Sequence, residues 1–109
     1  MHERIVMNAV SLLRPLLAVA ALTLATPSLA ADVARGKALH DKQCVSCHVK
    51  RYGGDGSEMY LRTDRMVRDR KALGQRVAAC NAMVNAGLFP EDEVDIAAYL
   101  AQHYYKFAK

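Results

Sequence analysis

Residues 44–48 read Cys44-Val45-Ser46-Cys47-His48, a Cys-x-x-Cys-His run around which the rest of the chain has to be arranged. Two thiols three positions apart can add to the two vinyl groups of one haem, and the adjacent His48 can then bind the iron as proximal ligand. A dithiol reductase would need a βαβ context, and a structural zinc site would need a second ligand pair at matching spacing. The sequence offers neither, so the run predicts one covalent c-type haem.

The first thirty residues have the pattern of a signal peptide. Arg4 and Arg14 form a basic n-region, and residues 16–25 form an apolar run of h-region length that is too short for a membrane span. Small residues at its end predict cleavage between Ala30 and Ala31, with an uncleaved N-terminal anchor as the alternative. Because haem of this type is attached outside the cytoplasm, we expect an exported protein of the bacterial periplasm, with no membrane span in the mature chain.

The mature chain, residues 31–109, forms one small domain of roughly 80 residues. A chain of this size buries little apolar surface and often needs a further stabilising element such as a disulfide or a metal. A haem held by two thioethers supplies a large apolar surface around which short helices can pack. We therefore expect the cofactor to stabilise the fold as well as to carry the function.

The composition of the mature chain predicts an all-α domain, because stretches rich in Ala, Lys, Arg and Leu dominate and β-branched alternation is absent. A first helix is expected from Val33 to Lys42, with Asp32 as its N-cap. The three glycines between Tyr52 and Ser57 predict a tight loop near the haem edge.

Two further helices follow in the second half of the chain. One is expected from Lys71 to Val84, with Cys80 on its apolar face as a buried, inert thiol; an intermolecular disulfide and iron ligation are the alternatives for Cys80. The last helix is expected to begin at Pro90, with acidic residues at its positive end, and to end near Phe107. Its apolar stripe is predicted to contain Ile96, Tyr99, Leu100, His103 and Phe107.

Three features together resemble the monohaem class I cytochrome c family: Gly36, the Cys-x-x-Cys-His run, and the Asp-Ile-Ala-Ala-Tyr-Leu sequence of residues 95–100. The resemblance covers nearly all of the mature chain. It implies a small cytochrome c fold in which short helices and loops enclose the haem and the N- and C-terminal helices cross closely, Gly36 meeting Tyr99. His40 departs from the large apolar residue common in the family, and we expect it to pack with a ring nitrogen satisfied.

The resemblance also implies a methionine as sixth iron ligand, taken from the segment before the last helix. Met83 is the first candidate, with Met59 and Met66 as alternatives. In some class I cytochromes that bind oxygen, an asparagine next to a disulfide-bonded cysteine caps the iron on the side of the sixth ligand. Here the corresponding residue is Ala79, and Cys80 has no partner once the motif cysteines hold haem. A vacant or weakly filled sixth position remains the alternative.

These features predict an electron carrier, not an enzyme: one haem cycles between ferric and ferrous iron during transient contacts with redox partner proteins. A gas-binding haem protein and a haem subunit of a larger oxidoreductase are the alternatives. The net charge is +4, and a basic segment at residues 50–76 contrasts with an acidic cluster at 91–95. This asymmetry can orient a partner, although solvated helix faces would look the same. Nucleic-acid binding is not expected, because the basic segment lacks interleaved base-stacking aromatic residues and the chain is expected to be exported.

Overall fold

Helices make up most of the part of the chain that the structure, a computed structural model, describes, which is residues 30–108. The predicted all-α class is confirmed there, since these residues form no strand. The signal-peptide prediction for residues 1–30 lies, apart from Ala30, outside the described residues. The elements are α1 (Val33–Gln43), α2 (Val45–Tyr52), α3 (Glu58–Leu61), α4 (Arg70–Val84), α5 (Pro90–Leu100) and a π-helix, η1 (Ala101–Tyr105), that continues α5. Within the described range, no helix combines the length and the apolarity that a membrane span requires.

Local signals explain where most of these helices begin and end. Asp32 caps α1 as predicted, its carboxylate accepting a hydrogen bond from the Arg35 N–H at 2.9 Å. Asp69 caps α4 in the same way, accepting from the Ala72 N–H at 2.7 Å. Gly53 ends α2 at φ 79°, a left-handed conformation that glycine adopts without steric cost, and so begins the predicted loop.

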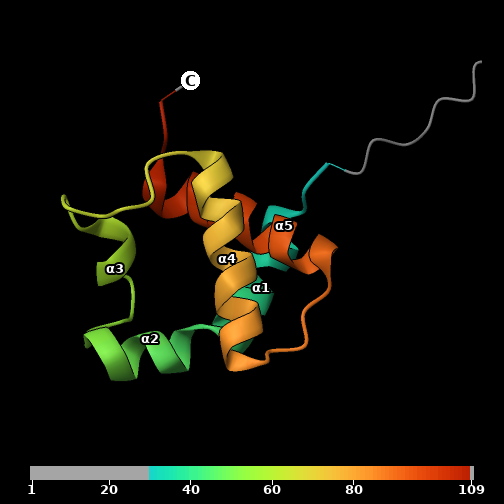
Figure 1. Ribbon diagram of the computed structural model, residues 1–109, viewed down its shortest axis with the longest axis horizontal. Coiled ribbons are helices and arrows are strands. Elements are labelled where there is room, and N and C mark those ends of the chain that lie inside the picture. Colours follow the sequence, from blue (N-terminus) through green and yellow to red (C-terminus); the bar gives the residue numbers. More distant parts are fainter. Residues whose placement is uncertain (1–29, 109) are drawn as a thin grey trace, which may run out of the picture.

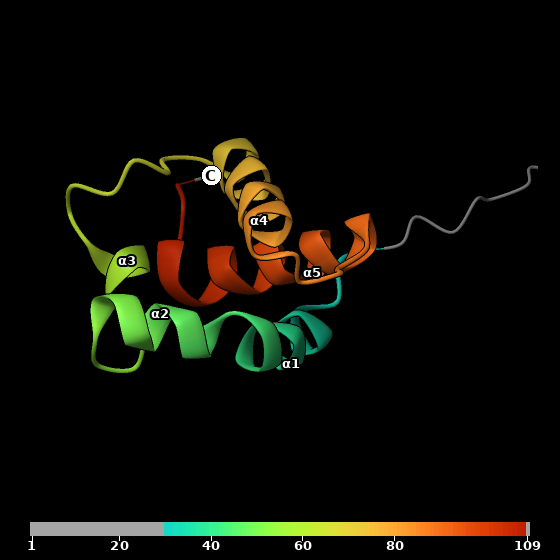
Figure 2. The same cartoon turned by 60° about the horizontal axis from the view of Figure 1, so that its bottom comes forward.

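The first and last helices pack against each other at very close range (Figure 2). A Cβ at Gly36 would lie 2.0 Å from the Asp95 carbonyl oxygen and 3.0 Å from the Ile96 nitrogen, so only glycine allows this approach. Gly36 therefore lies directly against the backbone of α5 at Asp95 and Ile96, and its predicted pairing with the Tyr99 ring stays a prediction. The Tyr99 ring lies one turn along, with its centroid 5.4 Å from that of His40.

The hydrophobic core lies where α4 crosses α5 and extends towards α3 and η1 (Figure 1). Leu73 of α4 and Ile96 of α5 are its most completely buried large side chains. The other buried members are Tyr60, Val67, Val77, Tyr99, Leu100, Ala101 and Tyr105. This core holds α4 and α5 together. Both helices face α2 and α3 across a cavity that is described below.

The last helix differs from its predicted course, because α-helical geometry ends at Leu100 and a π-helix follows. The wider π turn lets two consecutive side chains, Tyr104 and Tyr105, both pack on Tyr60, with ring centroids 5.2 and 5.8 Å away. The predicted apolar stripe is correct for the buried residues of α5. It is wrong for His103, which is exposed and stacks on Tyr99 instead of packing between helices.

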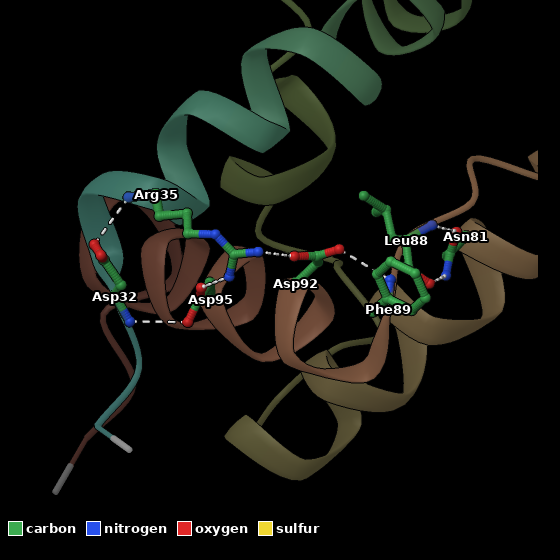
Figure 3. A network of polar contacts seen from close by, with 7 residues as sticks. All are labelled: Asp32, Arg35, Asn81, Leu88, Phe89, Asp92 and Asp95. Atoms are coloured by element: carbon green, nitrogen blue, oxygen red, sulfur yellow. Dashed lines mark hydrogen bonds and ion pairs between the residues drawn. The ribbon is translucent and has the colours of Figure 1, made fainter.

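Two of the acidic residues near the start of α5 belong to the interior, whereas Glu91 is exposed (Figure 3). Asp92 and Asp95 are buried, and both form ion pairs with Arg35, at 2.6 Å in the case of Asp95. Asp95 also accepts a hydrogen bond from the Asp32 N–H at 2.8 Å, and Asp92 accepts one from the Phe89 N–H at 2.9 Å. These two carboxylates fasten α1 to α5, so they are not available to steer a partner protein.

Candidate haem-binding site

A cavity of about 570 Å³ lies between the end of α1, α2, α3, α4 and α5, and mostly apolar side chains line it. Cys44, Cys47 and His48 all contribute to its wall. In Figure 1, α2 runs along one side of this region, α3 along another, and α4 passes in front. The volume falls within the range of pockets that enclose a small-molecule cofactor.

The two motif cysteines share one face of the chain as it enters α2. Cys44 joins α1 to α2 and is half-buried, whereas Cys47, in the first turn of α2, is exposed at the cavity edge. Burial, together with smaller effects of the nearby Cys80 and Cys47 thiols, raises the pKa of Cys44 to about 11. Because positions i and i+3 are neighbours on a helix surface, one flat ligand can reach both thiols.

His48 stands in the same wall with a ring nitrogen that nothing satisfies. Its Nδ1 is buried and makes no hydrogen bond within the described structure. The rings of Tyr52 and Tyr60 flank the imidazole, with centroids 5.6 and 5.2 Å away. Burial lowers the pKa of His48, and the adjacent Gly56 backbone opposes part of that shift without forming a well-directed hydrogen bond. The imidazole is therefore kept neutral, which is the form that binds a metal.

All three methionines considered as sixth ligand border the cavity. Met59 of α3 is half-buried and packs against the core. Met66 and Met83 are 84% and 73% exposed, respectively, and lie at the rim. The structure thus places Met83, Met59 and Met66 at one site and does not select one of them as the ligand. Met83 stays a prediction.

Cys80 is not buried in a closed core, which is where the sequence predicts an inert thiol. It is half-buried on α4 and lines the cavity together with Cys44 and Cys47. Its thiol is close enough to Cys44 to affect the pKa of that residue. The cavity therefore contains three free thiols, of which two belong to the motif.

Asn81, the next residue, fastens the end of α4 to the segment before α5 (Figure 3). Its side-chain amide donates to the Leu88 carbonyl at 3.0 Å and to the Glu93 carboxylate at 2.6 Å, and its Oδ1 accepts from the Leu88 N–H at 3.2 Å. These bonds use the amide completely, so Asn81 has a structural role beside the cavity.

Replacement of Asn81 by alanine is expected to lower the free energy of unfolding by about 1–3 kcal/mol, because backbone groups of Leu88 lose their half-buried partner. Chemical denaturation of the purified protein measures this change. The exposed Gln75, on the same helix, provides the control, since Gln75→Ala should change stability by less than about 0.5 kcal/mol. Equal effects of the two substitutions would contradict the role given to Asn81.

Two residues at the site were not identified from the sequence. Tyr60, which is buried, packs against His48, and burial raises its pKa, so that the phenol stays protonated. Arg65 donates to the carbonyls of Tyr60 and Tyr105 at 2.7 and 3.0 Å and so ties α3 to η1. No short motif contains either residue, because a loop sets their spacing from His48. The available signal was an aromatic residue four positions after the last glycine of the loop.

The donor set fits the predicted haem: two thiols at attachment spacing, one neutral imidazole in the cavity wall, and an apolar cavity that adjoins all three. Among residues 30–108, no group of three or more His, Cys, Asp or Glu side chains is arranged to hold a metal ion. Comparisons of the chain with protein-family models, curated proteins and solved structures yield no match.

Proposed function

We propose that this chain is an exported class I cytochrome c whose single covalent haem carries electrons between redox partner proteins. One observation supports the proposal most strongly: Cys44, Cys47 and His48 line the same apolar cavity, although the motif was chosen from spacing alone. Two cysteines placed at random on a small helical domain would have no reason to border the same apolar cavity as a histidine. The proposal also accounts for the cavity of about 570 Å³, since a bound porphyrin would occupy the space that α2, α3 and α4 surround.

Haem bound in this cavity supplies one-electron chemistry at its iron. Cys44 and Cys47 would hold the ring as thioethers, and the neutral His48 would bind the iron. Met83 would provide the second axial ligand, a soft and neutral sulfur that favours ferrous iron more than a second imidazole does. Apolar neighbours of the cavity, such as Leu73 and Val77, would exclude water from the cofactor.

The rim of the cavity suits a transient contact with an acidic partner. Arg51, Arg62 and Arg76 contribute to it and are exposed, and only Arg62 forms an ion pair, with Asp64 at 2.8 Å, among the described residues. The cavity is lined by four arginines, the fourth being Arg65, and by one carboxylate, Asp64, so positive charge exceeds negative charge there. The resulting field speeds encounter with a partner of opposite charge.

The visible spectrum of the purified protein in both oxidation states tests this function. We expect a covalent c-type haem, the weak far-red band of ferric iron bound to sulfur, and little response of the reduced protein to carbon monoxide. High-spin iron that binds carbon monoxide readily would instead support a gas-binding haem protein. The exposure of Met66 and Met83 favours that second candidate. Absence of haem from the exported chain would refute both.

Replacement of Met83 by alanine is expected to abolish the far-red band and to let reduced iron bind carbon monoxide, because the sulfur ligand is removed. Near-infrared absorption and carbon monoxide titration measure the two effects. Met59→Ala and Met66→Ala are matched controls, since both residues border the same cavity. If the band survives in the Met83 variant and disappears in one of the controls, the ligand is the control residue.

A further inference from the structure

Tyr60 is the central ring of an aromatic cluster that joins four helical elements. From α3 it contacts His40 of α1, His48 of α2, and Tyr104 and Tyr105 of η1, with ring centroids 5.7, 5.2, 5.2 and 5.8 Å away. Tyr60 itself is only 5% exposed. The π turn of η1 belongs to this arrangement, because it brings two consecutive tyrosines onto the same ring. No motif of the proposed function requires such a cluster.

A buried hydrogen bond fixes Tyr60 at its polar end. The Tyr60 hydroxyl and His40 Nε2 are 2.9 Å apart, and His40 is 4% exposed. His40 lies one turn after Gly36 on α1, where the close approach to α5 holds the helix in place. A buried polar pair that loses one member leaves the other unsatisfied, so each residue keeps the other in position.

The orientation of the His48 ring needs such a support. A histidine that binds a metal usually donates its second ring N–H to a carbonyl or carboxylate, and this bond sets the ring plane. Nδ1 of His48 makes no well-directed hydrogen bond of this kind among the described residues, although the Gly56 backbone lies near enough to the ring to affect its pKa. Instead, Tyr52 meets the ring edge-on at an interplanar angle of 77°, and Tyr60 lies against it at 38°. Packing against these two rings therefore determines the plane of the imidazole.

We propose that Tyr60, held by His40, is a positioning residue that sets the plane of the His48 imidazole at the iron. This inference rests on the proposed function, in which His48 binds haem iron. The plane of an axial imidazole determines how the iron orbitals are oriented within the porphyrin, so the protein can tune the electronic structure of the cofactor through this ring. Tyr60 would act on the haem through His48.

Proton NMR of the ferric holoprotein tests the proposal, because the pattern of the paramagnetically shifted haem methyl signals depends on the axial ligand plane. Tyr60→Phe keeps the ring but removes the hydroxyl that bonds to His40. We expect it to change the order or the spread of the methyl shifts, and His40→Leu to change them in the same direction. His40→Gln retains a group that can bond to the Tyr60 hydroxyl, and its spectrum should return towards that of the wild type.

Tyr105→Phe is the matched control, since it removes a phenol hydroxyl from the same cluster without touching the bond to His40. Methyl shifts in Tyr60→Phe that differ from the wild type no more than those of Tyr105→Phe would overturn the positioning role while leaving the electron-carrier proposal intact. A merely structural contribution would lower the unfolding temperature but leave the shift pattern unchanged. A wild-type chain isolated without haem would refute both proposals, because His48 would then have no iron to bind.

Discussion

The double substitution of Cys44 and Cys47 by serine is expected to yield a chain that carries no covalent haem. A serine hydroxyl does not add to a haem vinyl group as a thiol does, so both attachment points disappear together. Intact mass spectrometry and haem staining after denaturing electrophoresis measure the loss. The variant should also unfold at lower temperature, because the cavity of about 570 Å³ would lose the apolar group that is proposed to fill it.

Cys80→Ser is the matched control for that experiment. Cys80 is a free thiol in the same cavity but lies outside the motif, so its replacement should leave the haem in place with both thioethers. Loss of haem from this variant, or covalent haem in the double variant, would show that the attachment site has been assigned to the wrong thiols. The comparison also tests whether Cys80 binds the iron. If it does, its replacement should change the haem absorption spectrum.

A second large effect is expected from Gly36→Ala, which should lower the free energy of unfolding by about 3 kcal/mol, the upper end of the usual cost of overpacking. The added methyl group would be placed 2.0 Å from the Asp95 carbonyl oxygen, and backbone on both sides leaves no flexible side chain to yield. α1 and α5 would have to separate, which weakens the ion pairs of Arg35 and the placement of His40. Guanidinium denaturation of the holoprotein, with haem absorbance and helical signal followed together, measures the loss.

Gly74→Ala is the matched control, because the substitution is the same and also lies in a helix. A Cβ at Gly74 meets nothing within 4 Å, so the gain in helix propensity acts alone. That variant should be more stable than the wild type by up to about 1 kcal/mol. Opposite signs for the two glycines would establish close helix contact at Gly36; a Gly36→Ala protein as stable as the wild type would refute it.

Most of the helices could be predicted because their signals are local. Asp32 supplies a capping carboxylate, and Pro90 suits the first turn of a helix, so α1 and α5 begin where the sequence indicates. The middle helix was predicted from residue 71 and begins at Arg70. The loop of glycines likewise takes positive φ values, 79° at Gly53 and 84° at Gly56. Each of these features depends on residues a few positions apart.

Two helices and one change of helix type could not be predicted in this way. α2 has no side-chain cap and contains β-branched valines, yet it forms directly after α1 and continues until Gly53 ends it. α3 is a single turn, too short to produce a periodic pattern. The π turn after Leu100 accompanies the packing of Tyr104 and Tyr105 on Tyr60, a contact between distant segments.

The sequence by itself determined that the described chain is helical, where its main helices begin, and which three residues form the Cys-x-x-Cys-His motif. Only the tertiary structure decided that Cys80 faces the same cavity as that motif, that Tyr60 links His40 to His48, and that acidic residues of α5 hold Arg35 from 60 positions away. The physical reason is the range of the forces involved. Capping, propensity and turn preference act within one or two turns of a helix, whereas these pairings depend on which faces meet when the helices pack.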